Sequence, residues 1–96
     1  MAILVQLEAN AKPECVEELT GMIKQRFPET RAYDGCKEIT AYLNEDGHTM
    51  VFVEQWESKE HYEKYFAWRE ETGVLEQLGV LLQDPPNIRF FDLIDA

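Results

Sequence analysis

Residues 54–73, EQWESKEHYEKYFAWREETG, place much of the chain's aromatic content in the end of one strand and in one helix. Ser58 followed by Glu60 is typical of a helix start, because a serine side chain caps free backbone amides and an acidic first turn suits the helix dipole. Gly73 is a favoured residue just past a helix end. The stretch therefore predicts a strand that ends at Trp56 and an aromatic helix from Ser58 to about Gly73.

The chain before this stretch alternates strand and helix signals. Ala2 to Ala9 is rich in β-forming residues and predicts a strand. Pro13 favours the first turn of a helix, and apolar residues at helical spacing continue to Pro28, where proline is expected to stop the helix. The pattern then predicts a second strand, a hairpin loop and a returning strand, at Cys36–Leu43, Asn44–Gly47 and Thr49–Trp56.

The chain after Gly73 predicts a shorter apolar helix, Val74–Leu82, which is halted by Asp84-Pro85-Pro86, and a last strand over Asn87–Ile94. The resulting order is β-α-β-β-α-α-β. With right-handed crossovers this order gives one α+β domain over residues 1–96, a ferredoxin-like fold whose four-stranded, largely antiparallel sheet carries helices on one face.

Both faces of the predicted sheet are apolar. Val51 and Val53 alternate with Phe52, and the first and last strands show the same mixture. Helices can cover only one face, so the other face requires a different cover. A second copy of the chain, packed sheet against sheet, is the simplest one. The sequence therefore predicts a homodimer.

Charge and cysteine content exclude several classes of function. The 96 residues carry a formal net charge of −10 with a pI of about 4.5, which repels nucleic-acid phosphates and anionic lipid surfaces. The sequence also lacks an apolar run of the roughly 20 residues that span a membrane. Cys15 and Cys36 match no metal or redox spacing. We therefore expect a cytoplasmic protein with reduced thiols that binds neither nucleic acid nor membranes.

One side of the aromatic helix raises a question of function. At about 100° per residue, one arc of about 160° collects the large side chains and one cation. These residues are His61, Tyr62, Tyr65, Phe66, Trp68, Arg69 and Thr72. A buried arginine requires a partner. The candidates are the carboxylate of Glu54, the ring of Tyr62 or Tyr65, and an anionic oxygen of a ligand, and a structural salt bridge is the commonest of such explanations.

Several motifs resemble one known family. They are AKPE at residues 11–14, Gly35-Cys36, EQWESKEHY at 54–62 and LLQDPPNIRFFD at 81–92. In this order and spacing the chain resembles the antibiotic biosynthesis monooxygenase (ABM) family. The resemblance implies a dimeric α+β barrel of ferredoxin-like subunits, each with a pocket between helices and sheet. It also implies one of several activities: cofactor-independent oxygenation of anthrones or quinols, haem degradation, or action on a signalling molecule without oxygenation.

The resemblance also suggests roles for single residues. Trp56 matches the family tryptophan that lines the pocket, and Gln6 falls near an asparagine that haem-degrading members use. Those members ligate iron with a histidine where this chain has Phe66. His61 lies one turn too early and His48 lies in the hairpin loop, so haem and metal ligation are disfavoured and no cofactor is expected.

The predicted function is a monooxygenase that oxidises a small quinol, anthrone or other phenolic substrate without a cofactor. Arg69 would stabilise the substrate anion, and Glu54, Tyr65 or His61 would accept or relay a proton. The substrate-binding residues would be Gln6, Trp56, Tyr62 and Trp68.

Two other functions fit the same fold. One is a non-catalytic dimer that binds a small apolar ligand, and the other is an isomerase that acts on a small carbonyl compound through a glutamate or histidine base. A cavity of at least about 300 Å³ between helices and sheet would favour a ring-sized ligand.

Overall fold

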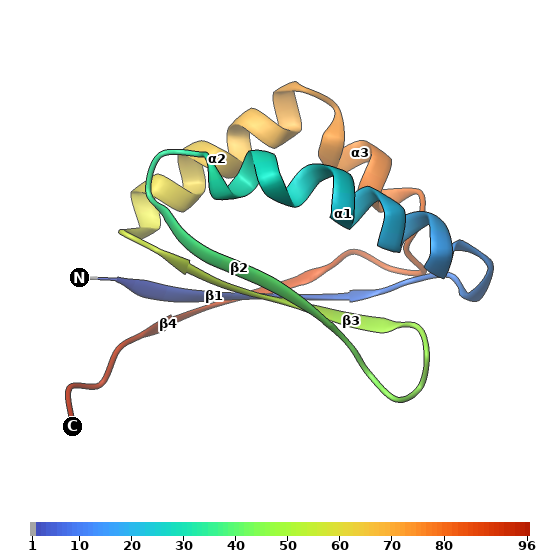
Figure 1. The fold of residues 1–96 in the computed structure, drawn as a ribbon, viewed down its shortest axis with the longest axis horizontal. Coiled ribbons are helices and arrows are strands. Elements are labelled where there is room, and N and C mark those ends of the chain that lie inside the picture. The colour runs from blue at the N-terminus through green and yellow to red at the C-terminus, as the bar shows by residue number, and fades with distance from the viewer. Residues whose placement is uncertain (1) are drawn as a thin grey trace.

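The computed structural model describes residues 2–96 and has two layers, a sheet and a set of helices that all lie on one of its faces (Figure 1). The strands are β1 (Ile3–Asn10), β2 (Cys36–Leu43), β3 (Thr49–Trp56) and β4 (Asn87–Asp92). They are ordered β2-β3-β1-β4, and each neighbouring pair is antiparallel. The helical elements are η1 (Pro13–Cys15), α1 (Val16–Arg31), α2 (Lys59–Glu71) and α3 (Val74–Gly79). This is the predicted ferredoxin-like α+β fold.

Helix α1 runs past the proline that was expected to stop it. Pro28 lies inside the helix, which continues to Arg31. Proline removes one hydrogen bond from a helix, here the one to the Lys24 carbonyl four residues earlier. The turns on either side of Pro28 are bonded to α2, because Arg69 Nη2 donates to the Arg26 carbonyl and to Thr30 Oγ1, each at 3.0 Å. The prediction that the helix stops at Pro28 was wrong, since α1 ends at Arg31.

The last elements are shorter than predicted. Helix α3 ends at Gly79 rather than Leu82, and β4 ends at Asp92 rather than Ile94. The residues after α3 pair instead with the end of β1: Leu82 forms an isolated bridge with Ala11. Leu81 and Leu82 leave the regular α-helix, because their backbone amides bond three residues back, to Leu78 and Gly79.

The aromatic helix begins as its cap predicts. The Ser58 hydroxyl accepts a hydrogen bond from the His61 amide at 3.2 Å, and Gly73 separates α2 from α3 with a φ of +81°. A positive φ costs glycine little, so this residue permits the change of direction between the two helices. Figure 1 shows the bend as the step from α2 to α3.

The side chains of the sheet divide into a covered face and an open face. Val5, Leu7 and Ala9 of β1 point at the helices and are buried. The strand register puts a second set on the opposite face: Leu4, Gln6, Thr40, Tyr42, Val51, Val53, Arg89 and Phe91. In this set Tyr42 is 58% exposed and Phe91 is 40% exposed. The same register also puts Glu8, Glu38, Gln55 and Asn87 on this face, so it mixes apolar and polar side chains, and the helices described in residues 2–96 leave it uncovered.

In residues 2–96, no helix has both the length and the apolar content that crossing a membrane requires.

Candidate functional site

A small cavity lies between the helices and the covered face of the sheet. Its volume is about 60 Å³. The lining is mostly apolar, from β1, β2, β3, α1, α2 and α3, and its polar members are Arg26, Thr30, Glu54, Tyr65 and Arg69. A ring-sized ligand typically needs about 300 Å³. A cavity of this volume has room for a few water molecules, and a ring would have to widen it.

Glu54 is the acidic side chain of the cavity wall. The alternation of β3 turns it towards the helices, between Phe52 and Trp56, and it is only 3% exposed. Its Oε1 atom accepts a hydrogen bond from the Trp56 indole nitrogen at 2.9 Å. Burial raises the pKa of this carboxyl from 4.5 to about 7, against the opposing effect of that hydrogen bond. Glu54 can therefore both hold and release a proton near neutral pH.

Trp56 lies in the core behind Glu54. Its side chain is fully buried, and its ring centroid is 4.9 Å from that of Tyr65 and 5.5 Å from that of Tyr62. Glu54, Tyr62 and Tyr65 line the cavity, and the indole packs against them from behind. Trp56 was expected at the wall or mouth of a pocket, and the structure instead places it one layer deeper, where it orients the Glu54 carboxyl.

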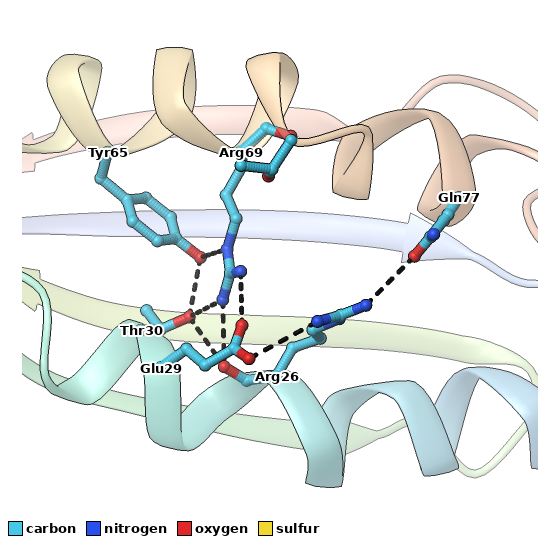
Figure 2. A network of polar contacts seen from close by, with 7 residues as sticks. Arg26, Glu29, Thr30, Tyr65, Arg69 and Gln77 are labelled. Atoms are coloured by element: carbon cyan, nitrogen blue, oxygen red, sulfur yellow. Dashed lines mark hydrogen bonds and ion pairs between the residues drawn. The ribbon is translucent and has the colours of Figure 1, made fainter.

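Arg69 is buried, lines the cavity and makes hydrogen bonds through all three guanidinium nitrogens (Figure 2). Each guanidinium nitrogen donates. The acceptors are the Tyr65 hydroxyl at 3.0 Å, Glu29 Oε1 at 2.8 Å, the Arg26 carbonyl at 3.0 Å and Thr30 Oγ1 at 3.0 Å. The guanidinium carbon also lies 4.6 Å from the centroid of the Trp68 ring. These contacts join α2 to the last turn of α1.

The ion-pair partner of Arg69 is Glu29. The alternative that paired Arg69 with Glu54 was wrong. The Glu54 carboxyl accepts a hydrogen bond from Trp56, whereas Glu29 of α1 lies 2.8 Å from the Arg69 guanidinium. The ring of Tyr65, another of the expected partners, does contact Arg69 at 5.3 Å. The Arg69 hydrogen bond lowers the pKa of Glu29, so this carboxylate stays charged at neutral pH.

Tyr65 joins the cavity to this network. Its hydroxyl lies 2.7 Å from Thr30 Oγ1 and accepts from Arg69 Nε. Burial raises the pKa of Tyr65 above its usual value, although the hydrogen bonds from Arg69 and Thr30 oppose that rise. Tyr65 therefore remains a neutral phenol at physiological pH. The pKa of Tyr62, whose ring also lines the cavity, is raised by burial as well.

The remaining predicted site residues lie elsewhere. The His61 ring bonds to Ser58 Oγ at 2.6 Å and packs over Gly35, at the start of α2. Trp68 stacks on Arg69 and Tyr33 outside the cavity. Gln6 points to the open face of the sheet. The structure thus brings together four of the eight residues: Glu54, Tyr62, Tyr65 and Arg69.

Three residues of this site were missed in the sequence. Arg26, Glu29 and Thr30 project from one side of α1 towards Arg69. Glu29 and Thr30 lie three and four residues after Arg26, and residues at this spacing share one face of a helix. This signal was missed because the helix was expected to stop at Pro28, which put Glu29 and Thr30 outside it.

In residues 2–96, no set of three or more His, Cys, Asp or Glu side chains is placed to hold a metal ion. Cys15 and Cys36 are free thiols, and burial raises the pKa of Cys36.

Comparison with known proteins gives the family. The sequence profile described as antibiotic biosynthesis monooxygenase matches residues 2–71, which is more than half of the chain. The chain belongs to the ABM family. Among curated proteins, no sequence matches this ABM protein.

Solved structures share the ABM fold along the whole chain. The structure of Rv0793 from Mycobacterium tuberculosis has a TM-score of 0.87 and 22% identity, and the match covers 100% of this chain and 98% of that one. The ActVA-Orf6 monooxygenase of Streptomyces coelicolor, solved with nanaomycin D, has a TM-score of 0.82 and 24% identity, with 99% and 89% covered. A putative antibiotic biosynthesis monooxygenase from Deinococcus radiodurans has a TM-score of 0.84 and 18% identity, with 98% and 94% covered. At these identities the likeness shows the fold.

Proposed function

We propose that this ABM protein is a monooxygenase that oxidises a small phenolic substrate without a bound cofactor, with Glu54 as its general base. One observation supports the proposal above the others: a buried carboxyl with a pKa raised to about 7 lines an otherwise largely apolar cavity. A general base works best when its pKa lies near the working pH. Strongly shifted pKa values of buried groups cluster at functional sites.

The base would start the reaction by removing a proton from an activated carbon of the substrate, such as the CH₂ group of an anthrone. The carbanion, delocalised as a phenolate, is electron-rich enough to reduce dioxygen. The carbon loses four electrons as CH₂ becomes C=O. One oxygen atom enters the carbonyl and the other leaves as water with the two protons, so the substrate itself is the reductant.

The other residues of the cavity would have supporting roles. The rings of Tyr62 and Tyr65 would be walls for the substrate ring. Arg69 would be a positioning residue, because Glu29, Thr30 and the Tyr65 hydroxyl already take its donors. The Trp56 indole would orient the Glu54 carboxyl. We give His61, Trp68 and Gln6 no part in the proton transfer, since they lie outside the cavity.

Oxygen uptake tests the proposal. The protein, treated with a chelator and free of flavin, is offered anthrones, hydroquinones and catechols. We expect uptake with at least one of them, and a loss of about 100-fold or more in kcat for Glu54→Gln. Glu57→Gln is the matched control, because Glu57 is an exposed glutamate three residues further on. The proposal fails if no substrate supports uptake, or if Glu54→Gln turns over as fast as wild type.

The same carboxyl supports a second candidate function. A buried glutamate with a pKa near 7 could also move a proton between carbons next to a carbonyl group, as in an isomerase. Such an enzyme would exchange substrate hydrogen for deuterium from heavy water without consuming oxygen. Ligand binding with neither exchange nor uptake would indicate a non-catalytic binding module, a function that the small cavity of about 60 Å³ also fits.

We further propose that the protein is a homodimer in the cytoplasm, built by packing the open faces of two sheets. The support is the apolar side chains on that face, among them Leu4, Val53 and Phe91. An interface of this kind should bury about 2,000 Å² or more in total. Analytical ultracentrifugation at micromolar concentration tests the assembly, and a folded species of 11.2 kDa would contradict it.

A further inference from the structure

Arg26 stands between two hollows of the molecule. One is the cavity beside Glu54, of about 60 Å³, and Arg26 lines it. The other is a surface groove of about 480 Å³ between α1 and the α3 region, and Arg26 lines that groove as well. Figure 2 shows the side chain reaching from α1 towards Gln77 across the seam between the helices. A ligand too long for the cavity would therefore pass Arg26 on its way into the groove.

The guanidinium of Arg26 is poorly bonded compared with that of Arg69. Its Nη1 atom lies 3.5 Å from Glu29 Oε2 and its Nη2 atom lies 3.5 Å from Gln77 Oε1. Both distances are at the outer limit of a hydrogen bond. Its Nε atom is buried and lacks a hydrogen-bond partner among residues 2–96. A buried donor without a partner is costly, so a ligand that supplies an acceptor here gains more than the hydrogen bond alone.

The charges at the seam favour an anion. Arg26 and Arg69 are two cations, and Glu29 is the carboxylate that both contact. The Glu29 carboxylate lies 2.8 Å from Arg69 Nη1 but 3.5 Å from Arg26 Nη1. Glu18 also lines the groove, so the anionic group is expected at Arg26 itself rather than further along. A planar guanidinium suits a carboxylate, since two parallel N–H groups match its two oxygens.

We propose that Arg26 binds the carboxylate of an acidic phenol, whose ring enters the widened cavity beside Glu54 while its acid group lies at the mouth of the groove. This inference rests on the proposed function and names its substrate class. It makes Arg26 a specificity-determining residue. The two carboxylate oxygens would accept from Nε and Nη2, which gives Nε its missing acceptor and replaces the long contact to Gln77.

Calorimetry under nitrogen tests the inference with two probes, 2,5-dihydroxyphenylacetate and its methyl ester. We expect the acid to bind wild type at least 10-fold more tightly than the ester, since hydrogen bonds to charged groups are the strong ones. Arg26→Gln should lose this preference, so that the acid and the ester bind it with similar affinities. Lys24→Gln is the matched control, because it removes a cation from an exposed position of the same helix and should keep the preference.

A second measurement needs only the wild-type protein. The Arg26 Nε–H resonance, assigned by its absence in Arg26→Lys, should move downfield with the acid and stay in place with the ester. Equal affinities for the two probes, an acid preference that survives in Arg26→Gln, or an unmoved resonance would each overturn the inference. Failure of both probes to bind would also overturn it, whereas oxygen uptake with any uncharged phenol would still support the oxygenase.

Discussion

Two buried side chains at the same cavity differ in how well they are satisfied. Arg69 and Glu54 are each 3% exposed. Arg69 donates to four acceptors, whereas Glu54 accepts one hydrogen bond, from Trp56, among the contacts described in residues 2–96. A fully bonded buried charge behaves as part of the architecture, while an under-bonded one retains a capacity to react. The comparison therefore separates a residue that holds helices together from a residue available for chemistry.

The largest effect that would sharpen this comparison is on stability. Arg69→Met should lower the free energy of unfolding by about 4 kcal/mol, because it removes the charged hydrogen bonds to Glu29, Tyr65, Thr30 and the Arg26 carbonyl, which join α2 to α1. Urea unfolding at matched protein concentrations measures the loss. Glu29→Gln is the control and should cost much less, because Glu29 is exposed and a glutamine still presents an oxygen. An Arg69→Met protein as stable as wild type would break the comparison.

The next effect is the pH dependence that Glu54 gives to stability. The folded chain keeps this proton up to a pKa of about 7, whereas the unfolded chain loses it near 4.5. The unfolded state therefore binds fewer protons between these values, and the free energy of unfolding should fall as pH rises from 4.5 to about 7. This group contributes roughly 3 kcal/mol over that range and nothing further above it. The measurement is the difference between wild type and Glu54→Gln in urea unfolding from pH 4 to 8. Parallel curves would show that the carboxyl titrates normally.

The smallest effect concerns Tyr65, which touches both ends of the cavity. Tyr65→Phe removes an acceptor for Arg69 and a partner for Thr30, so we expect a loss of about 1 kcal/mol in unfolding free energy. If Tyr65 serves only to position its neighbours, turnover should fall less than 10-fold. Tyr33→Phe is a control, because that hydroxyl makes only a long, exposed contact of 3.5 Å. A 100-fold loss of turnover would move Tyr65 into the chemistry.

Local patterns were enough to predict the fold. Ser58 and Gly73 mark the two ends of the aromatic helix, and strands β2 and β3 have the predicted bounds. Each of these signals involves residues close together in sequence. Pro28 shows the limit, because α1 continues past it to Arg31, and Arg69, about 40 residues away in sequence, bonds to Glu29 and Thr30 in the turn after it. A sequence pattern carries no record of that contact.

The candidate site was predictable only in part. Glu54 and Arg69 stand out as charges in apolar patterns, but their partners depend on which helix lies over which strand. The pairing of Arg69 with Glu29 is set by the packing of α1 against α2. Gln6 and Trp56 illustrate a second limit, since a family likeness assigned them to one pocket and the strand register put their side chains on opposite faces. Side-chain direction follows from register, and register is a property of the assembled sheet.

The strand order has a consequence for how the chain folds. Strand β1, made first, lies in the middle of the sheet and pairs with β3 and β4, so Ile3 meets Asp92 from almost the far end of the sequence. The β2–β3 hairpin, by contrast, closes over a few residues and can form early. The β1–β4 pair closes a loop of nearly the whole chain, and long loops are slow to close. We therefore expect the hairpin to gain protection first in pulse-labelled hydrogen exchange and the β1–β4 pair last. Early protection of β4 amides would refute that order of events.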